Sequence, residues 1–285
     1  DLNMGAVGVT GSSASNGLAR EADVVLAVGT RLQDFTTGSW ALFQGAGVKI
    51  VALNAQPFDA GKHGALPLVA DAKAGVETLA KELAGWKSPA AWLEKARSGK
   101  AAWLKDAADV TRATNAVPSD AQVIGAVQRV FGEDAILVCA SGGLPGELHK
   151  LWQAGGPGTY HLEYGYSCMG YEIAGGLGVK MASPERDVYV MVGDGSYLML
   201  NSELATSVML GAKIVVVLLD NRGYGCINRL QQATGGRPFN NLLADTQHET
   251  LPAIDFAAHA RSLGAEAEKV TGIAELEEAL DRAAA

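Results

Sequence analysis

The chain has 285 residues, of which 35 are glycine, 48% are hydrophobic and 19% are charged, with a net charge of −8. This glycine content exceeds the roughly 7% of average proteins, but it follows no three-residue period, which excludes a collagen-like fibre. Recurrent Leu, Ile and Val runs exclude a disordered chain, and no apolar stretch reaches the roughly 18 residues of a membrane span. The negative charge argues against a nucleic-acid partner, because such proteins carry basic patches.

The cysteines bear on the cellular compartment. Cys139, Cys168 and Cys226 are odd in number and show no C-x-x-C spacing. This pattern favours a reducing cytoplasm over a disulfide scaffold or a zinc site. We therefore expect a cytoplasmic protein whose cysteines are small buried hydrophobic residues.

The first half of the chain alternates short apolar strands with helices, which predicts a parallel sheet in an α/β domain. The expected elements are strands at 24–28, 48–53 and 66–69 and a helix at 72–83. Residues 86–118 are rich in Ala, Lys, Asp and Trp without a strand pattern, so we expect a helical connector with a break at 115–118. The first domain is accordingly predicted to span 1–85.

The pattern restarts in the second half, which predicts a second Rossmann-like α/β domain over 119–285. A helix should open at Ser119 or Asp120, because a capping residue there precedes an apolar periodic run. The expected strands are 135–139, 188–192, 214–219 and 266–270, and the later helices are 170–181, 201–210, 253–263 and 273–284.

Two strand ends in this second domain carry polar residues. The strand at 188–192 runs into Gly193-Asp194-Gly195-Ser196, and the strand at 214–219 runs into Asp220-Asn221-Arg222-Gly223. Open α/β sheets bind ligands at the carboxyl ends of their strands, so Asp194 and Asn221 can converge. A carboxylate, an amide oxygen and a free carbonyl suit Mg²⁺, and the amides of Gly195 and Ser196 suit phosphate.

A lone Gly-Asp-Gly would indicate only a tight turn. Here one helix and one buried strand, Ser196 to Leu219, separate it from Asp220-Asn221. The whole arrangement resembles the diphosphate motif of thiamine-diphosphate enzymes. That resemblance implies thiamine diphosphate and Mg²⁺ as cofactors.

The resemblance also implies individual site residues. Asp194, the Asn221 side chain and the Gly223 carbonyl would hold Mg²⁺, while Ser196 would contact the diphosphate. The segment 166–171 matches the part of these enzymes that props the cofactor into its bent form; Met169 would be the prop, although core packing is its alternative. The Ser167 carbonyl would accept the exocyclic amine of the cofactor. Glycine turns that would approach the diphosphate include Gly142, Gly193, Gly195, Gly223 and Gly225.

Two further segments are open to more than one interpretation. Ser141-Gly142-Gly143, which follows a strand, is either a phosphate or substrate loop or a plain turn. The first half resembles the middle domain of the same enzymes, which holds FAD or a nucleotide in some relatives. Because this chain lacks G-x-G-x-x-G after a strand, we interpret its first domain as structural.

Three phrases point to one branch of this superfamily: Arg31 to Trp40, Phe58 to His63, and Asn221 to Gln231. They resemble the trihydroxycyclohexane-1,2-dione hydrolases of bacterial myo-inositol catabolism, over most of the chain. Membership would imply hydrolysis of a carbon–carbon bond in a polyhydroxylated cyclic dione to give 5-deoxyglucuronate. Thiamine diphosphate would add to one carbonyl and act as the electron sink.

Enzymes of this kind also use a glutamate on a separate N-terminal pyrimidine-binding domain, commonly from another subunit of a homodimer or homotetramer. Nothing in this chain resembles that domain, and Asp1 looks like a cut end. We therefore assign that role to no glutamate here. The expectation is a fragment that is inactive alone and that carries half of the active site.

The proton-transfer residues are not identified by the sequence. Weak candidates are His149, Tyr224 and Gln231, and Glu147 and Glu163 are open possibilities. Each also has a structural interpretation, which for a lone histidine near a loop is the more common one.

Two alternatives to the dione hydrolase remain. One is another thiamine-diphosphate enzyme, such as an acetolactate synthase or a glyoxylate carboligase, which usually lacks the phrase Asp34 to Gly38. The other is a non-catalytic nucleotide-binding or regulatory module built on the two sheets.

Overall fold

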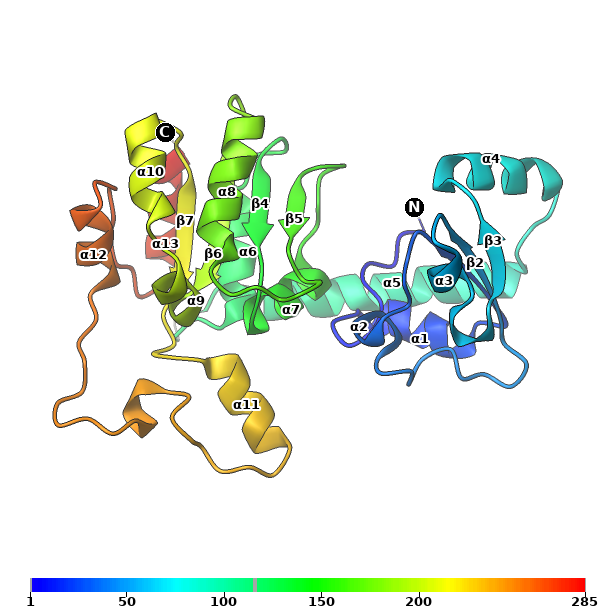
Figure 1. The fold of residues 1–285 in the computed structure, drawn as a ribbon, viewed down its shortest axis with the longest axis horizontal. Helices are drawn as coiled ribbons and strands as arrows, with labels where there is room; N and C mark the ends of the chain where they lie inside the picture. Colours follow the sequence, from blue (N-terminus) through cyan, green and yellow to red (C-terminus); the bar gives the residue numbers. More distant parts are fainter. Residues whose placement is uncertain (1, 115–116, 285) are drawn as a thin grey trace. The chain divides into compact units, whose positions relative to one another are not determined.

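The computed structural model describes residues 2–114 and 117–284, so part of the predicted break at 115–118 lies outside the described residues. The chain divides into two compact units, Asp1–Asp109 and Val110–Ala285 (Figure 1). Each unit is built on a parallel sheet with flanking helices, which confirms the predicted α/β class. No helix in the described ranges is long and apolar enough to cross a membrane.

In the first unit, the described strands form a parallel sheet in the order β1-β2-β3, with Val28 beside Leu53 and Leu53 beside Leu68. All three strands were predicted, two with the observed bounds. The elements of this unit are α1 (Ser13–Glu21), β1 (Val24–Val28), α2 (Asp34–Thr37), β2 (Lys49–Asn54), α3 (Pro57–Ala60), η1 (Lys62–Gly64), β3 (Leu66–Val69), α4 (Ala72–Glu82) and α5 (Ala90–Val110).

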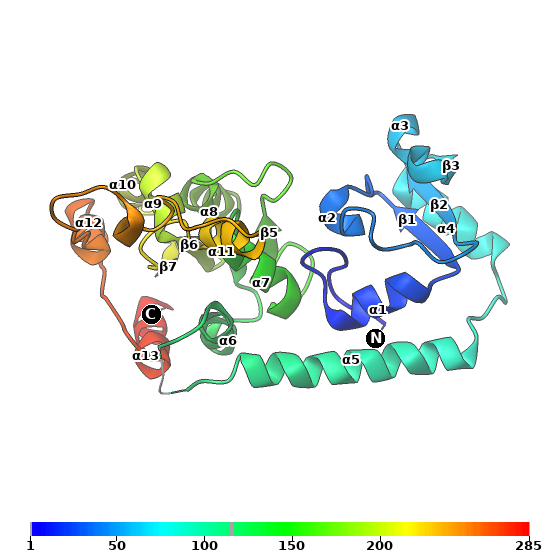
Figure 2. The same ribbon diagram turned by 90° about the horizontal axis from the view of Figure 1, so that it is seen from below.

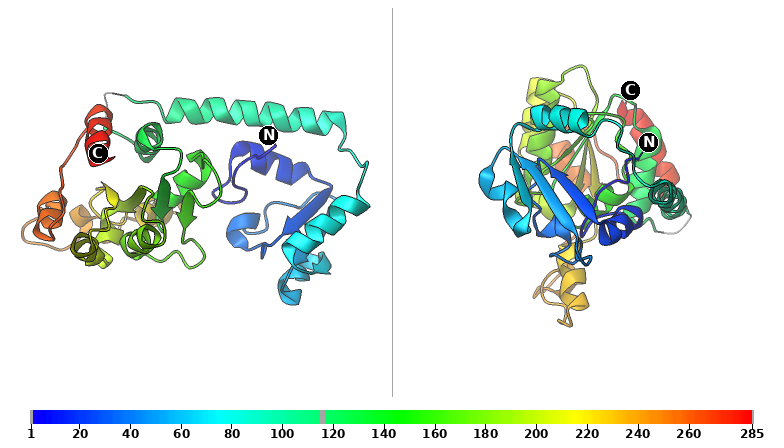
Figure 3. Two further views of the ribbon diagram at one scale, coloured as in Figure 1. Left: turned by 90° about the horizontal axis from the view of Figure 1, so that it is seen from above. Right: turned by 90° about the vertical axis from the view of Figure 1, so that its right-hand side faces the viewer.

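Helices cover both faces of this sheet. Ala19 of α1 belongs to one buried cluster with Ala27, Ile50 and Ala52. On the other face α4 packs against β2, where Gly75 lies on the fully buried Leu53. Figure 3 shows α1 and α4 on opposite sides of the strands. Alternate residues of β2 therefore serve two cores, as expected for a strand buried on both faces.

The segment predicted as a helical connector forms α5. Its first part packs within the first unit, where Gly99 faces Ala14 of α1 and the Lys95 ammonium pairs with the Glu21 carboxylate. The helix therefore contributes to the first unit through both packing and charge.

In the second unit, the described strands form a parallel sheet in the order β5-β4-β6-β7. Helices α8 and α10 lie on one side of it and α6 and α13 on the other (Figure 2). The elements are α6 (Asp120–Val130), β4 (Ile136–Cys139), α7 (Gly143–Leu151), β5 (Tyr160–Leu162), α8 (Tyr171–Ala182), β6 (Val188–Gly193), α9 (Asp194–Met199), α10 (Glu203–Leu210), β7 (Val215–Leu219), α11 (Gly225–Ala233), η2 (Leu243–Asp245), α12 (Phe256–Ser262) and α13 (Ile273–Ala284).

The predicted start of α6 is confirmed. The Ser119 hydroxyl accepts from the Gln122 amide at 3.3 Å, and the Gln122 side chain accepts from the Ser119 amide at 2.9 Å. This reciprocal pair is a capping box, which satisfies amides that the first turn of a helix leaves unpaired.

Two predictions of strands need correction. Residues 266–270 form no strand; the Ala267 carbonyl accepts from the Arg261 guanidinium at 2.7 Å, and Glu268 pairs with Arg282 of α13. Strand β5 was not predicted, because its three residues carry no periodicity and it exists through pairing of Tyr160 with Leu137. Local pattern therefore failed where side-chain or cross-strand contacts decide the conformation.

The contact between α8 and β6 provides a test of the packing. A Cβ on Gly176 would lie 2.3 Å from Cγ2 of the buried Val190. We expect Gly176→Ala to lower the free energy of unfolding by about 1–3 kcal/mol, because overpacking outweighs the gain in helix propensity.

Gly178 in the same helix is the matched control, since a Cβ there would meet nothing within 4 Å. Gly178→Ala should leave stability unchanged or raise it by up to about 1 kcal/mol. Urea unfolding of both variants measures the difference, and equal stabilities would contradict this packing.

Candidate active site

The two polar turns singled out in the sequence lie side by side. Strands β6 and β7 are neighbours, and Gly193 at the end of β6 is paired with Leu219 at the end of β7. Helix α9 begins directly at Asp194, and the turn after β7 leads into α11 (Figure 1). The predicted convergence of the 193–196 and 220–223 segments is therefore present in the fold.

A hydrogen bond joins these turns. Asp194 is 2% exposed, and its Oδ2 accepts from the Gly223 amide at 2.7 Å. Its other oxygen, Oδ1, is buried and has no hydrogen-bond partner among the described residues. A buried carboxylate oxygen without a partner is costly. A metal ion or another positively polarised group at Oδ1 would offset this cost.

The electrostatic surroundings of Asp194 agree with this need. Burial raises the pKa of the Asp194 carboxyl, and the nearby Asp220 carboxylate raises it further. The backbone amides of Gly223, Gly195 and Asn221 face the group and lower its pKa. A divalent cation would favour the ionised form that burial opposes.

Glycines allow the turns after β6 and β7 to approach each other closely. Gly223 has a φ of 142°, and a Cβ there would lie 2.4 Å from the Asn241 carbonyl oxygen. A Cβ on Gly195 would lie 2.7 Å from the Tyr224 ring and 3.4 Å from the Gly223 carbonyl oxygen. The close approach of backbones therefore places the Gly223 carbonyl beside the residue that follows Asp194.

These residues fit the magnesium site that the motif implies. No cluster of three or more His, Cys, Asp or Glu residues in the described ranges could hold a metal ion. The set here is of another kind: one carboxylate, the Asn221 amide, which lies beside Gly225, and the Gly223 carbonyl. Such an all-oxygen set suits Mg²⁺ that completes its shell with phosphate oxygens and water.

The structure also shows a residue that the sequence analysis missed. Glu172 is 1% exposed, and its carboxylate accepts hydrogen bonds from the Ser196 hydroxyl at 2.7 Å, the Gly170 amide at 3.0 Å and the Ser141 amide at 3.3 Å. It thus joins three segments that the motif assigned to the cofactor site. The available signal was a lone acid among the apolar residues that open α8.

The Ser196 hydroxyl is both a hydrogen-bond donor and an acceptor within the protein. Its hydroxyl donates to Glu172 and accepts from the Gly170 amide at 2.7 Å. The residue is 3% exposed. The hydroxyl therefore serves the internal network, so a contact from Ser196 to a diphosphate would have to come from its backbone amide.

The segment with Ser167 and Met169 is exposed at its centre and fixed at its ends. Ser167 is exposed with a φ of 56°, and Met169 is half-buried. The Glu163 carboxylate accepts from the Tyr166 amide at 3.1 Å and from the Cys168 amide at 2.7 Å. These two bonds hold Ser167 between them in the left-handed region, which is uncommon for a residue other than glycine.

The loop Ser141-Gly142-Gly143 leads from β4 into α7. Gly142 adopts a φ of 98°, and Ser141 is 8% exposed with its hydroxyl buried and unpartnered among the described residues. The Arg229 guanidinium of α11 lies against Gly143, where a Cβ would be 2.4 Å from Nη2. A guanidinium beside the start of a helix favours an anion, and the choice between a phosphate or substrate loop and a plain turn stays a prediction.

The three weak catalytic candidates differ in their surroundings. Burial lowers the pKa of His149, whose ring lies edge-on to Tyr164 at 5.2 Å. Tyr224 is 39% exposed and packs on Gly195, next to Asp194. Gln231 donates to the Arg237 carbonyl and accepts from the Asn241 side chain, each at 2.5 Å. The Gln231 side chain therefore connects two parts of the loop that follows α11.

The expectation for the cysteines holds in part. The structure shows three free cysteines among the described residues, and Cys139 is buried in β4. Cys168, however, is exposed, because it lies in the turn that Glu163 holds at the surface. The prediction that all three are buried is wrong for this residue.

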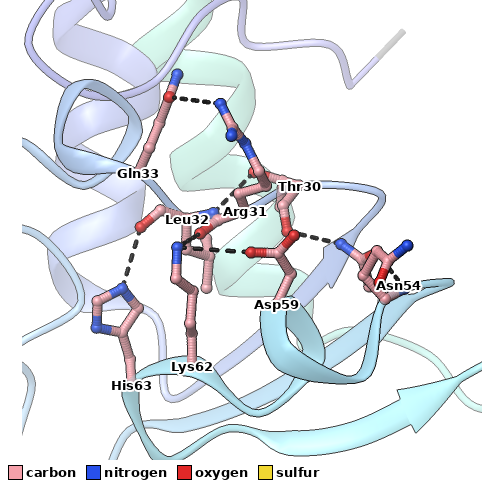
Figure 4. Close-up of polar contacts among 9 residues, drawn as sticks. Thr30, Arg31, Leu32, Gln33, Asn54, Asp59, Lys62 and His63 are labelled. Atoms are coloured by element: carbon pink, nitrogen blue, oxygen red, sulfur yellow. Dashed lines mark hydrogen bonds and ion pairs between the residues drawn. The ribbon is translucent and has the colours of Figure 1, made fainter. Parts of the chain in front are cut away.

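In the first unit, two of the three phrases that resemble dione hydrolases lie together (Figure 4). The Lys62 ammonium donates to the Arg31 carbonyl at 3.2 Å, and His63 Nε2 is 3.0 Å from the Leu32 carbonyl oxygen. The His63 ring stacks on Trp40 at 3.9 Å. These contacts tie together the segments that follow β1 and β2.

Comparison with known proteins decides the family. Residues 140–285 match the family profile "Thiamine pyrophosphate enzyme, C-terminal TPP binding domain", and residues 1–79 match "Thiamine pyrophosphate enzyme, central domain". The chain belongs to the thiamine pyrophosphate enzyme family. Both profiles agree with the two Rossmann-like units of the fold.

Curated relatives extend over nearly the whole chain. It is 42% identical to 3D-(3,5/4)-trihydroxycyclohexane-1,2-dione hydrolase of Geobacillus thermodenitrificans and 41% identical to the hydrolase 1 of that name from Bacillus cereus. It is 39% identical to the protein of the same name from Clostridium tetani. Each alignment covers 98% of this chain but 48% of the relative. The chain thus spans about half the length of these relatives.

The turn around Ser167 predicts a pH dependence. The two amide hydrogen bonds to Glu163 lower the pKa of its carboxyl. Because the pKa of Glu163 is lowered in the folded turn, its ionised carboxylate stabilises the turn at pH values above the pKa of an unperturbed glutamate. This stabilisation is lost as the pH falls through the lowered pKa.

Carboxyl-detected NMR titration should therefore place the Glu163 midpoint below the roughly 4.3 of an unperturbed glutamate. A Glu163 midpoint at or above about 4.3 would contradict the two hydrogen bonds.

Proposed function

We propose that this chain is the central and cofactor-binding part of a thiamine-diphosphate-dependent and Mg²⁺-dependent hydrolase that cleaves a carbon–carbon bond in a trihydroxycyclohexane-1,2-dione, in myo-inositol catabolism. The observation that carries the proposal is the joined turn of Asp194 and Gly223, with an unpartnered buried oxygen at a strand-end site. The names of relatives about 40% identical over 98% of the chain support the substrate class.

The residues of the chain would divide the work of cofactor binding. The Asp194 carboxylate, the Asn221 side chain and the Gly223 carbonyl would hold Mg²⁺, and the amides of Gly195 and Gly142 would face the diphosphate. Bound thiamine diphosphate would supply a nucleophilic carbon and an electron sink for the cleavage. The Ser167 carbonyl and the Met169 side chain would set the orientation of the cofactor's pyrimidine and thiazolium rings.

Proton transfer would fall to residues near these turns. The lowered pKa of His149 keeps its imidazole neutral at physiological pH, so that it can accept a proton. Tyr224 can donate a hydrogen bond from its partly exposed position beside Gly195. We set Gln231 aside, because both ends of its amide are occupied within its own loop.

The proposal includes domains and partners. We assign 1–85 to the central domain, 86–118 to a helical connector and 119–285 to the diphosphate-binding domain. An N-terminal pyrimidine-binding domain and a second subunit would complete the site in a cytoplasmic homodimer or homotetramer, and the 285 residues alone would be inactive. Exposed apolar side chains on α9 and α10 support a subunit contact; they include Leu198, Met199, Met209 and Leu210.

Calorimetry on the full-length protein tests the cofactor assignment. We expect thiamine diphosphate to bind in the presence of Mg²⁺, and Asp194→Ala to weaken that binding at least a hundredfold, because the variant removes the only carboxylate of the proposed metal site. Asp281→Ala, on the exposed side of α13, is the control for loss of one negative charge. Unchanged binding by a folded Asp194→Ala protein would show that the metal lies elsewhere, and no binding by the wild type would favour a non-catalytic module.

A substrate comparison tests the reaction. The full-length enzyme should convert the trihydroxycyclohexane-1,2-dione to an open-chain acid and should not form acetolactate from pyruvate or condense glyoxylate. Product formation can be followed by mass spectrometry with ¹⁸O-water, which should label the new carboxylate. Acetolactate or a glyoxylate-derived product without turnover of the dione would overturn the assignment in favour of a synthase or a carboligase.

A further inference from the structure

Two glutamates flank the segment 166–170, which contains Ser167 and Met169. On one side Glu163 accepts from the Tyr166 and Cys168 amides at 3.1 and 2.7 Å. On the other side Glu172 accepts from the Gly170 amide at 3.0 Å. Three alternate amides of one five-residue segment therefore donate to carboxylates.

The backbone of this segment is held in an unusual shape. Ser167 has a φ of 56° and Gly170 a φ of 92°. At Gly170 a Cβ would lie 2.9 Å from the Leu200 Cβ, so the segment also approaches the end of α9 closely. Left-handed backbone at a residue other than glycine persists only where its surroundings determine it. At Ser167 the determining group is the Glu163 carboxylate, which accepts from the amides on both sides of it.

Glu172 does more than cap its own helix. It is the second residue of α8, where a carboxylate commonly interacts with the amides of the same helix. Its bonds instead reach the Ser141 amide after β4 and the Ser196 hydroxyl after β6. Burying a carboxylate is expensive unless several donors surround it. An apolar residue would fill this place at less cost, but it would not fix three segments relative to one another.

We propose that Glu163 and Glu172 are positioning residues that hold the 166–170 segment in its cofactor-receiving shape before thiamine diphosphate binds. This inference rests on the proposed function. Glu163 sets the turn that presents the Ser167 carbonyl, and Glu172 anchors the Gly170 end to the Ser141 and Ser196 turns. Neither residue contacts the cofactor; each acts through backbone amides.

Hydrogen exchange on the full-length protein without cofactor tests whether these hydrogen bonds hold the 166–170 segment. In Glu163→Gln, the amide side chain can accept only one of the two bonds, because its NH₂ group is a donor. We expect at least one of the Tyr166 and Cys168 amides to exchange at least about tenfold faster, with the Gly170 amide unchanged. In Glu172→Gln, the Gly170 and Ser141 amides should be the ones affected. Wild-type rates in Glu163→Gln would overturn the proposal.

Cofactor affinity tests whether the shape of the 166–170 segment affects cofactor binding. Calorimetry with thiamine diphosphate and Mg²⁺ should show a Kd about tenfold higher for Glu163→Gln than for the wild type. The thermal midpoint should change little, because Glu163 is only partly buried. Glu278→Gln, on the exposed face of α13, is the control for the same loss of charge. An unchanged Kd in a variant with faster exchange would also overturn the positioning role.

Failure of the proposed function can be distinguished from failure of the positioning role. If wild-type protein binds no thiamine diphosphate, the proposed function and the cofactor part of this inference both fail, whatever the exchange rates. If wild type binds and Glu163→Gln binds equally well, only the positioning role fails. Because Glu172 is buried and its variant can unfold, Glu163→Gln decides the role of Glu163, and the role of Glu172 fails if a folded Glu172→Gln protein keeps wild-type exchange at the Gly170 and Ser141 amides.

Discussion

The hydrogen bond from the Gly223 amide to Asp194 Oδ2 is the contact on which the site depends. It joins the turns that follow two neighbouring parallel strands, and it uses one carboxylate oxygen while leaving the other buried and unpartnered among the described residues. The bond requires glycine at 223, because any side chain there would collide with the Asn241 backbone. The chain thus accepts the cost of burying a charge where a cation would compensate for it.

A second carboxylate organises the other side of the same sheet edge. Glu172 collects donors from the segments around Ser141, Gly170 and Ser196. The two acids have opposite roles, since Asp194 retains an unused oxygen whereas both oxygens of Glu172 are occupied by protein donors. A group with spare bonding capacity suits a ligand, and a saturated group suits a support.

Much of this arrangement could be predicted because it follows from local pattern. The apolar runs of β1, β3 and β6 and the capping box of α6 are local features. Between Asp194 and Asn221 the structure has two helices, α9 and α10, before β7, where the sequence pattern predicts one helix and one strand. The role of Glu172 could not be predicted in this way, since its partners lie up to 31 residues away. Strand β5 was missed because pairing with β4 determines it, and 266–270 was wrongly predicted as a strand because side-chain contacts from Arg261 and Arg282 determine its conformation.

We propose that Asp194, Asn221 and Gly223 would form the metal end of a thiamine-diphosphate site. Crystals of the full-length protein grown with thiamine diphosphate and Mn²⁺ in place of Mg²⁺ test it most directly, because Mn²⁺ gives an anomalous signal. We expect one anomalous peak within about 2.3 Å of Asp194 Oδ1, the Asn221 side-chain oxygen and the Gly223 carbonyl oxygen. Cofactor density with the peak bound to other residues, or with Asp194 Oδ1 facing no cation, would contradict it.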